Sequence, residues 1–156
     1  MSGRRSRPYR MGMRLVAVLL VVCTSLTGCG RSTLDIGYDG DDASFALAQE
    51  AAGMWNEACR GRLVVVHRGP GDLPMTSVAG PLGYADDRKG STRLVDDVAV
   101  SIVFNSARPA RSVLAAIAHE MGHALGLKHT GEGLMQSPMS PATDLFITAE
   151  DCREVR

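Results

Sequence analysis

The chain has 156 residues, with 17 basic and 17 acidic side chains and a formal net charge of zero. This length suits one domain with a modest hydrophobic core, and the neutral balance gives no reason to expect nucleic acid as a partner. The positive charge is unevenly spread, because the first fourteen residues hold five arginines and no acid.

A short apolar run, Leu15–Val22, follows this basic start, and small and polar residues come next. A basic region, a short apolar region and a small-residue site are typical of a secretory signal peptide. A membrane-spanning helix needs about 20 apolar residues. The run falls well short of that unless residues 23–27 are counted in, and the alternative is then a retained N-terminal anchor. Arg4 and Arg5 also occur in twin-arginine signals, but the residues after them do not match that pattern well.

The end of this region, Leu26-Thr27-Gly28-Cys29, resembles the lipobox of bacterial lipoproteins. The resemblance implies that Cys29 becomes the first mature residue and carries lipid, which anchors the protein to the outer face of a bacterial membrane. Two or more acyl chains anchor a protein stably, whereas one binds only marginally. We therefore expect a signal peptide over 1–28, a lipidated lead-in over 29–41 and a folded domain over 42–156. The alternative is a chance cysteine beside an ordinary cleavage site.

Two cysteines remain after the expected processing, Cys59 and Cys152. Disulfides persist in exported proteins, and an even pair of cysteines in such a chain favours a bridge. This bridge would close a long loop and stabilise the fold by roughly 2–4 kcal/mol. The alternative is two buried free thiols.

The first part of the mature chain predicts a strand and a helix. Leu34–Tyr38 has strand character, and apolar residues recur at helical spacing over Ser44–Cys59. Asp41 suits the N-cap of this helix and Gly61 its end. Trp55, the only tryptophan, is expected in the core.

The middle of the chain predicts further strands. Leu63–His67 lacks alternation, which favours a strand buried on both faces, as in a parallel sheet. A loop rich in Gly and Pro is expected over Gly69–Pro81, a short strand over Gly83–Ala85 and a polar turn over Asp86–Ser91. Asp97–Phe104 alternates, which predicts a strand with one apolar face.

Helices are expected in the last third. Pro109 suits the first turn of a helix that runs to about Gly126. Thr148–Asp151 is similar to a capping box that opens a last, short helix. Strands and helices mixed in one short chain favour an α/β (α+β) fold, with helices packed on a mixed, mostly parallel twisted sheet.

Three of the four histidines lie within eleven residues. His119 and His123 are spaced i and i+4, so both project from one face of the helix and can bind one metal ion. The apolar stripe on the same helix lies roughly opposite this pair and would pack on the core: Leu114, Ile117, Met121 and Leu125.

A third ligand must come from another direction, because zinc prefers a tetrahedral arrangement. Gly126 permits the positive φ that ends a helix and turns the chain. His129 can then swing back toward the metal. Three imidazoles leave the fourth position open, as catalytic Zn²⁺ sites require.

The segment from His119 to His129 reads His-Glu-x-x-His-x-x-Gly-x-x-His and resembles the metzincin metalloproteases, especially the matrixins. The resemblance implies a zincin catalytic domain that hydrolyses peptide bonds, with Glu120 as the general base that activates the water on zinc. It also implies a Met-turn beneath the metal, for which Met135 is the candidate and Met139 the alternative. In this family an edge strand binds substrate by strand addition, and Gly83-Tyr84-Ala85 is the candidate.

The chain departs from the family in several ways. No tyrosine follows Met135 at the spacing of a tyrosine ligand, and no segment with a latency cysteine is present. The C-terminal part is short, which implies a shallow cleft on that side. Four aspartates could bind calcium as in matrixins, although solvated turn carboxylates are the simpler interpretation: Asp86, Asp87, Asp96 and Asp97. His67 is expected to be structural.

The leading hypothesis is a monomeric, lipid-anchored zinc endopeptidase acting on peptide or protein substrates outside the cytoplasmic membrane. One alternative is a zinc-containing binding lipoprotein that performs no catalysis, against which the intact Glu120 argues. Another is a zinc hydrolase with a different substrate. Cleavage specificity is not readable from the sequence.

Overall fold

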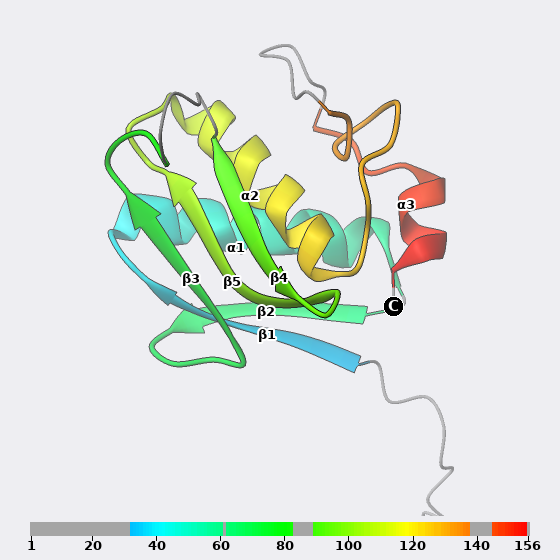
Figure 1. Cartoon of the computed structure of the whole chain (residues 1–156), viewed down its shortest axis with the longest axis horizontal. Coiled ribbons are helices and arrows are strands. Elements are labelled where there is room, and N and C mark those ends of the chain that lie inside the picture. Colours follow the sequence, from blue (N-terminus) through cyan, green and yellow to red (C-terminus); the bar gives the residue numbers. More distant parts are fainter. Residues whose placement is uncertain (1–31, 61, 83–88, 138–144, 156) are drawn as a thin grey trace, which may run out of the picture. The chain divides into compact units, whose positions relative to one another are not determined.

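The computed structural model describes residues 32–60, 62–82, 89–137 and 145–155. In these ranges it contains eight elements (Figure 1), and their bounds are β1 Ser32–Asp39, α1 Asp42–Ala58, β2 Arg62–Arg68, β3 Leu73–Val78, β4 Gly90–Val95, β5 Val98–Asn105, α2 Ala110–Ala124 and α3 Ala149–Glu154. The expected signal peptide, Cys29 and the expected strand Gly83-Tyr84-Ala85 lie outside the described residues.

The strands form one five-stranded sheet in the order β2-β1-β3-β5-β4. β1 is parallel to both β2 and β3, and β3 is parallel to β5. Only β4 is antiparallel to its neighbour, and it lies at one edge. The predicted mixed, mostly parallel sheet with packed helices is therefore confirmed, and Figure 1 shows α1 and α2 together on one face of it.

The first strand and helix follow the sequence prediction closely. Asp41 caps α1, and its carboxylate accepts a hydrogen bond from the backbone N–H of Ser44 at 2.8 Å. The helix ends at Ala58 with Cys59 as its cap, before Gly61, which lies outside the described residues. β1 lies between β2 and β3, so the folded domain includes this strand and begins ahead of residue 42.

Two predictions about the strands were wrong. β2 is parallel as expected, but it is an edge strand whose Leu63 and Val65 are exposed, so only one of its faces is buried. The expected loop over 69–81 contains β3, which lies between β1 and β5. Gly and Pro favour loops, and they obscured this strand in the sequence. Its pairing on both sides and the burial of Leu73 and Met75 fix it in place.

The strand predicted over 97–104 is present as β5, but its apolar face is covered only in part. Ile102 and Phe104 are fully buried, whereas Val98 is 63% exposed. β4, which the sequence did not predict, pairs with β5 through a two-residue turn of Asp96 (φ 51) and Asp97 (φ 63). Positive φ at both positions is the geometry of tight hairpin turns, and Asp tolerates it better than most residues.

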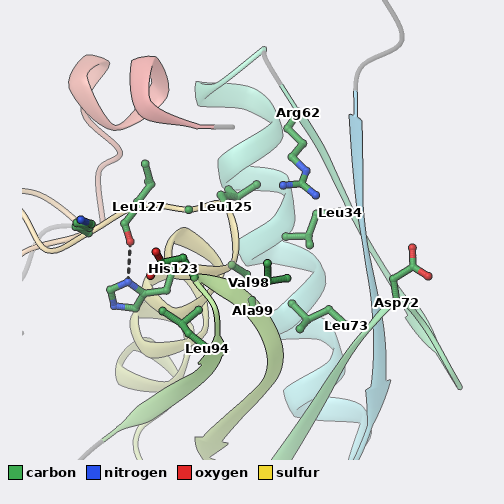
Figure 2. Close-up of a pocket in the computed structure, with 14 residues that line it drawn as sticks. Leu34, Arg62, Asp72, Leu73, Leu94, Val98, Ala99, His123, Leu125 and Leu127 are labelled. Carbon is green, nitrogen blue, oxygen red and sulfur yellow. Dashed lines mark hydrogen bonds between the residues drawn. The ribbon is translucent and has the colours of Figure 1, made fainter.

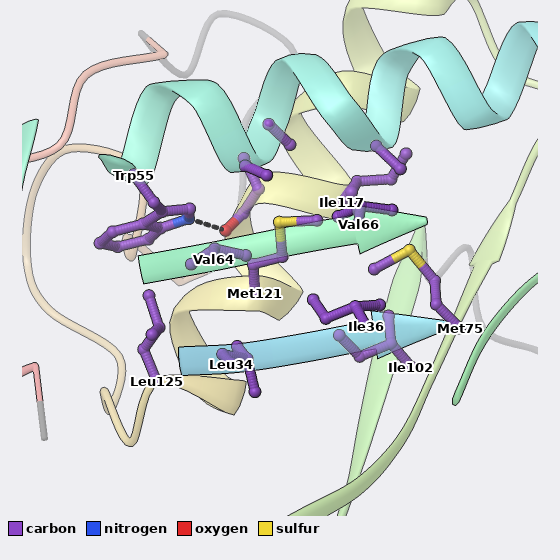
Figure 3. Packing of buried hydrophobic residues seen from close by; sticks show 14 of the residues in the cluster. Leu34, Ile36, Trp55, Val64, Val66, Met75, Ile102, Ile117, Met121 and Leu125 are labelled. Carbon is purple, nitrogen blue, oxygen red and sulfur yellow. Dashed lines mark hydrogen bonds between the residues drawn. The ribbon is translucent and has the colours of Figure 1, made fainter. Parts of the chain in front are cut away.

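The core lies between the sheet and the two long helices (Figure 3). Trp55 is buried as predicted, and its indole Nε1 donates a hydrogen bond to the Ala118 carbonyl at 2.9 Å, which joins α1 to α2. The predicted Cys59–Cys152 disulfide is confirmed. So is the capping box of α3, in which Thr148 and Asp151 bond each other's backbone. Within the described ranges, every helix is too short or too polar to cross a bilayer.

Candidate metal centre

The helix α2 places the first two histidines. Pro109 stands at its N-cap and the helix ends at Ala124, close to the predicted bounds. Its apolar stripe is buried, as expected from the periodicity. Gly126 has φ +91, its N–H donates to His123 O at 3.0 Å, and the Leu127 N–H donates to Gly122 O at 3.0 Å. This pair of bonds is a Schellman motif, which turns the chain back toward α2.

The turn brings three histidine side chains to one point. The Nε2 atoms of His119, His123 and His129 are 3.2 Å apart in all three pairs. Zinc held tetrahedrally at about 2.0–2.1 Å from three imidazole nitrogens requires about 3.3 Å between them. The triangle therefore fits one zinc ion, and it is the one group of three metal-ligating side chains among the described residues.

Backbone carbonyls orient two of these rings. His119 Nδ1 donates to Leu134 O at 2.7 Å, and His123 Nδ1 donates to Leu127 O at 2.9 Å. A carbonyl oxygen only accepts, so Nδ1 carries the proton and each Nε2 of the neutral ring presents a lone pair. Two lone pairs 3.2 Å apart repel each other unless a cation lies between them. The hydrogen bonds thus support the metal interpretation independently of the spacing.

Burial also favours the neutral form of two of the three histidines. It lowers the pKa of His119 to about 4; the Leu134 carbonyl opposes this shift, and the two other histidines reinforce it. Burial likewise lowers the pKa of His129, with a further contribution from His123. Metal ligands must be deprotonated, so His119 is ready to bind at neutral pH. The site is open on one side, because His119 is 5% exposed whereas His129 belongs to the exposed residues.

Met135 lies beneath the site, at the position predicted for a Met-turn residue. It is fully buried, and a Cβ built on Gly122 would come within 2.3 Å of its sulfur. Any larger residue at the fourth position of the motif would therefore displace this buried side chain. The loop around it is closed by a bond from the Thr130 N–H to Met135 O at 2.9 Å. The same loop supplies the Leu134 carbonyl to His119, so it supports the metal ligands directly. The alternative, Met139, lies outside the described residues.

Glu120 projects to a different side of α2, toward the edge strand β4. It is 7% exposed, and its Oε2 accepts a hydrogen bond from the Thr92 hydroxyl at 2.7 Å. A Cβ on Gly90 would come within 2.7 Å of Glu120 Cγ, so Gly90 also leaves room for this side chain. Sequence analysis missed both β4 residues, since they precede Glu120 by about thirty positions and belong to no motif.

The other residues singled out in the sequence lie apart from the triad or outside the described ranges. His67 pairs with Asp35 across β2 and β1 at 2.9 Å. Asp96 and Asp97 form the hairpin turn, and Asp86 and Asp87 are among the residues not described.

A pocket of about 450 Å³ lies beside the metal centre (Figure 2). His123 forms part of its wall, and most of the remaining wall residues are aliphatic: Leu34, Leu73, Leu94, Val98, Ala99, Ala124, Leu125 and Leu127. Figure 2 shows His123 at one side of this pocket, held by its hydrogen bond to Leu127. Sequence analysis did not predict the pocket.

Comparisons with known proteins add little to this geometry. No protein-family model matches the chain, and no curated protein matches it significantly. Among solved structures, that of myroilysin is similar, with a TM-score of 0.47 and 16% sequence identity over 66% of this chain. The match spans 45% of the myroilysin chain. At this level of similarity, the functional conclusion has to rest on the residues themselves.

Proposed function

We propose that this protein is a zinc endopeptidase. The observation that carries the proposal is the equilateral triangle of Nε2 atoms from His119, His123 and His129, with Glu120 next to the first of them. The Nδ1–carbonyl bonds, the Gly126 turn and the buried Met135 support it, because each helps to hold that triangle. The intact His-Glu-x-x-His-x-x-Gly-x-x-His motif points to peptides as substrate.

Zinc, Glu120 and Thr92 have separate roles in the proposed reaction. When bound, zinc supplies Lewis acidity that activates water and polarises the substrate carbonyl. Glu120 takes the proton of the attacking water on its carboxylate and delivers it to the amine nitrogen that leaves. The Thr92 hydroxyl holds one carboxylate oxygen and thereby fixes the direction in which the other points. General acid–base groups of this kind contribute about 10²–10⁴-fold to rates.

The edge strand β4 is the surface on which a peptide would lie. None of the described strands pairs with its outer edge, and its Thr92 touches Glu120. Extended peptides commonly bind by adding a strand to such an edge. In this proposal β4 takes the role first expected of Gly83-Tyr84-Ala85, a few residues earlier in the chain.

Metal analysis and a single substitution test the function. We expect the purified full-length protein to hold one zinc ion per chain and to cleave a mixed peptide library, and chelation to abolish cleavage. Glu120→Gln should lower kcat by about 10²–10⁴-fold while zinc stays bound. Glu57→Gln, an exposed change on α1, is the matched control and should leave cleavage unchanged. If the zinc-loaded protein cleaves no peptide, the result would instead support the alternative of a zinc-containing binding lipoprotein that performs no catalysis.

The location outside the cytoplasm is part of the proposal. The basic start, the apolar run and Leu26-Thr27-Gly28-Cys29 support a lipid anchor on Cys29, and the Cys59–Cys152 disulfide fits an oxidising compartment. Mass spectrometry of the protein isolated from membranes should find a diacylated N-terminal cysteine. Cys29→Ala should release the protein from the membrane fraction; retention with an unprocessed N-terminus would favour the uncleaved anchor.

A further inference from the structure

We propose that the tip of the β4–β5 hairpin contacts the surface of a phospholipid bilayer and holds the metal centre close to it. The partner is the headgroup layer and the adjoining part of the acyl chains. This inference rests on the lipid anchor proposed for Cys29, and it names the part of the domain that the anchor brings to the membrane.

Apolar side chains gather at the tip of this hairpin. Val98 is 63%, Leu94 47% and Val95 46% exposed, and they are three of the four most exposed large apolar side chains in the described ranges. Val95 pairs directly with Val98 across the turn of Asp96 and Asp97, so their side chains project from the same face of the hairpin. Single exposed apolar residues are common, but a group of them at one turn indicates a contact surface.

The register of the strands places this tip at the end of the sheet where β1 begins. Tyr38 of β1 is level with Met75 of β3, which is level with Ile102 of β5. Four residues back along the parallel strands β1 and β5, Leu34 is therefore level with Val98. These two residues also border one pocket, so they are close in space. Figure 1 shows the β4–β5 turn and the start of β1 at the same end of the sheet.

The proposed anchor keeps this end of the sheet near the bilayer. Cys29 precedes Ser32, the first residue of β1, by three residues. Three extended residues span at most about 11 Å. A lipid on Cys29 would therefore hold the start of β1 within about that distance of the headgroups. The hairpin tip is level with the start of β1, so its apolar side chains come within reach of the same surface.

The charges around the tip suit the headgroup layer. Asp96 and Asp97 form the turn itself, and their carboxylates keep the contact shallow because charged groups stay out of the acyl region. Arg93 and Lys128 are exposed nearby, and long basic side chains can reach the headgroups while apolar neighbours enter the boundary below. Two acids and two bases balance each other, so the contact should not require anionic lipid.

This contact would set the height of the metal centre above the bilayer. Thr92, which donates a hydrogen bond to Glu120, precedes Val95 by three residues on β4. Three residues of a strand span about 10 Å. A peptide paired with β4 would therefore have one of its ends at the membrane surface.

Tryptophan reporters test the contact in full-length protein purified from membranes and reconstituted in phosphatidylcholine vesicles. Lipids brominated on the acyl chains near the headgroup quench tryptophans that touch them. We expect Val95→Trp to lose emission in brominated vesicles relative to plain ones. The native Trp55 is buried in the core and serves as the unquenched baseline.

A second exposed valine provides the matched control. Val78 is 38% exposed and pairs with Asn105, seven residues along β5 from Val98. This separation corresponds to about 23 Å along the strand, so Val78→Trp should keep its emission in brominated vesicles. Adding Val98→Ser to the Val95→Trp protein should reduce the quenching, whereas adding Val78→Ser should leave it unchanged.

Three results would overturn the inference. The first is equal emission of Val95→Trp in plain and brominated vesicles. The second is equal quenching of Val95→Trp and Val78→Trp, since the hairpin tip would then have no preference for the bilayer. The third is a change in Val95→Trp emission that follows protein concentration without vesicles, which would assign the tip to contact with a second copy of the chain.

Mass spectrometry of the same samples separates this inference from the proposed anchor. Lipid on Cys29 without quenching of Val95→Trp would sink the hairpin contact alone. Quenching of Val95→Trp in protein that carries no lipid on Cys29 would sink the anchor alone and support the contact. The peptidase function is tested separately by zinc analysis and Glu120→Gln, and it does not depend on the fluorescence results.

Discussion

The two walls of the metal site are built differently. On one side, α2 and the loop from Gly126 to Gln136 hold the histidines through backbone carbonyls and a fully buried Met135. On the other side, β4 reaches Glu120 through Thr92 and Gly90 and exposes aliphatic residues at its end. The geometry of the histidine triad therefore depends on one continuous segment of chain, whereas the proposed base and the proposed substrate surface depend on contacts between distant segments. Substitutions in the first wall should lower stability, and those in the second should mainly alter catalysis.

The largest expected effect on stability comes from the disulfide, which belongs to neither wall. The Cys59–Cys152 bridge joins the end of α1 to α3, and the two cysteines are 93 positions apart in the sequence. Replacing both cysteines by serine should lower the free energy of unfolding by about 2–5 kcal/mol, measured by urea denaturation. Reduction of the wild type serves as the matched comparison. A change below about 1 kcal/mol by both routes would show that the fold does not depend on this link.

The pH dependence of the metal-free protein should report the burial of His119. Its folded pKa is about 4, below the ordinary value of 6.5, so the unfolded state takes up the proton first as pH falls. Stability should decline between about pH 6.5 and pH 4 by on the order of 3 kcal/mol. Urea denaturation of the chelated protein against pH measures this. His119→Gln should remove this part of the pH dependence; an identical slope in the variant would contradict the assignment.

Two glycines offer a direct comparison of the walls. A Cβ on Gly122 meets the sulfur of the fully buried Met135 and the ring of Trp55, whereas a Cβ on Gly90 meets only Glu120, the proposed base. Gly122→Ala should destabilise the protein by about 1–3 kcal/mol and weaken zinc binding. Gly90→Ala should affect the rate of cleavage more than the stability, because it displaces the base. Thermal unfolding and zinc titration of the two variants measure these effects. A larger loss of stability in Gly90→Ala than in Gly122→Ala would contradict the expectation.

The smallest expected effect concerns the Thr92 hydroxyl. Thr92→Val keeps the shape of the side chain but removes the hydrogen bond to Glu120. We expect kcat to fall about tenfold with KM little changed, since a hydrogen bond to a charged group is worth about 1.5–3 kcal/mol. Thr92→Ser restores the hydroxyl and should restore most of kcat. If Ser behaved like Val, the hydroxyl would have no role in positioning Glu120.

The histidine site was predictable because its signals are local. His119 and His123 lie on one helix face because they are four residues apart. Gly126 ends the helix because glycine readily adopts a positive φ. The cap of α1, the capping box of α3 and the burial of Trp55 follow from equally local patterns. These features need only a few neighbouring residues to specify them.

The order of the strands in the sheet was harder to predict because its signals are spread along the chain. β3 was hidden by glycines and prolines, and it is a strand because β1 and β5 pair with it on both sides. β2 resembled a strand buried on both faces, but it lies at an edge. Neither fact follows from a short window of sequence, since strand order is decided by which segments meet in space.

The order of residues along α2 and the turn after it is enough to specify three histidines and one glutamate at metal-site spacing. Other side chains and carbonyls that contact them come from elsewhere in the chain and are brought there by the fold. It set Thr92 against Glu120 and placed the Leu134 carbonyl on His119. It also opened a pocket between His123 and the β4–β5 hairpin. The reason is physical: helix periodicity and glycine turns act over a few residues, whereas strand pairing and pocket walls join residues that the chain keeps far apart.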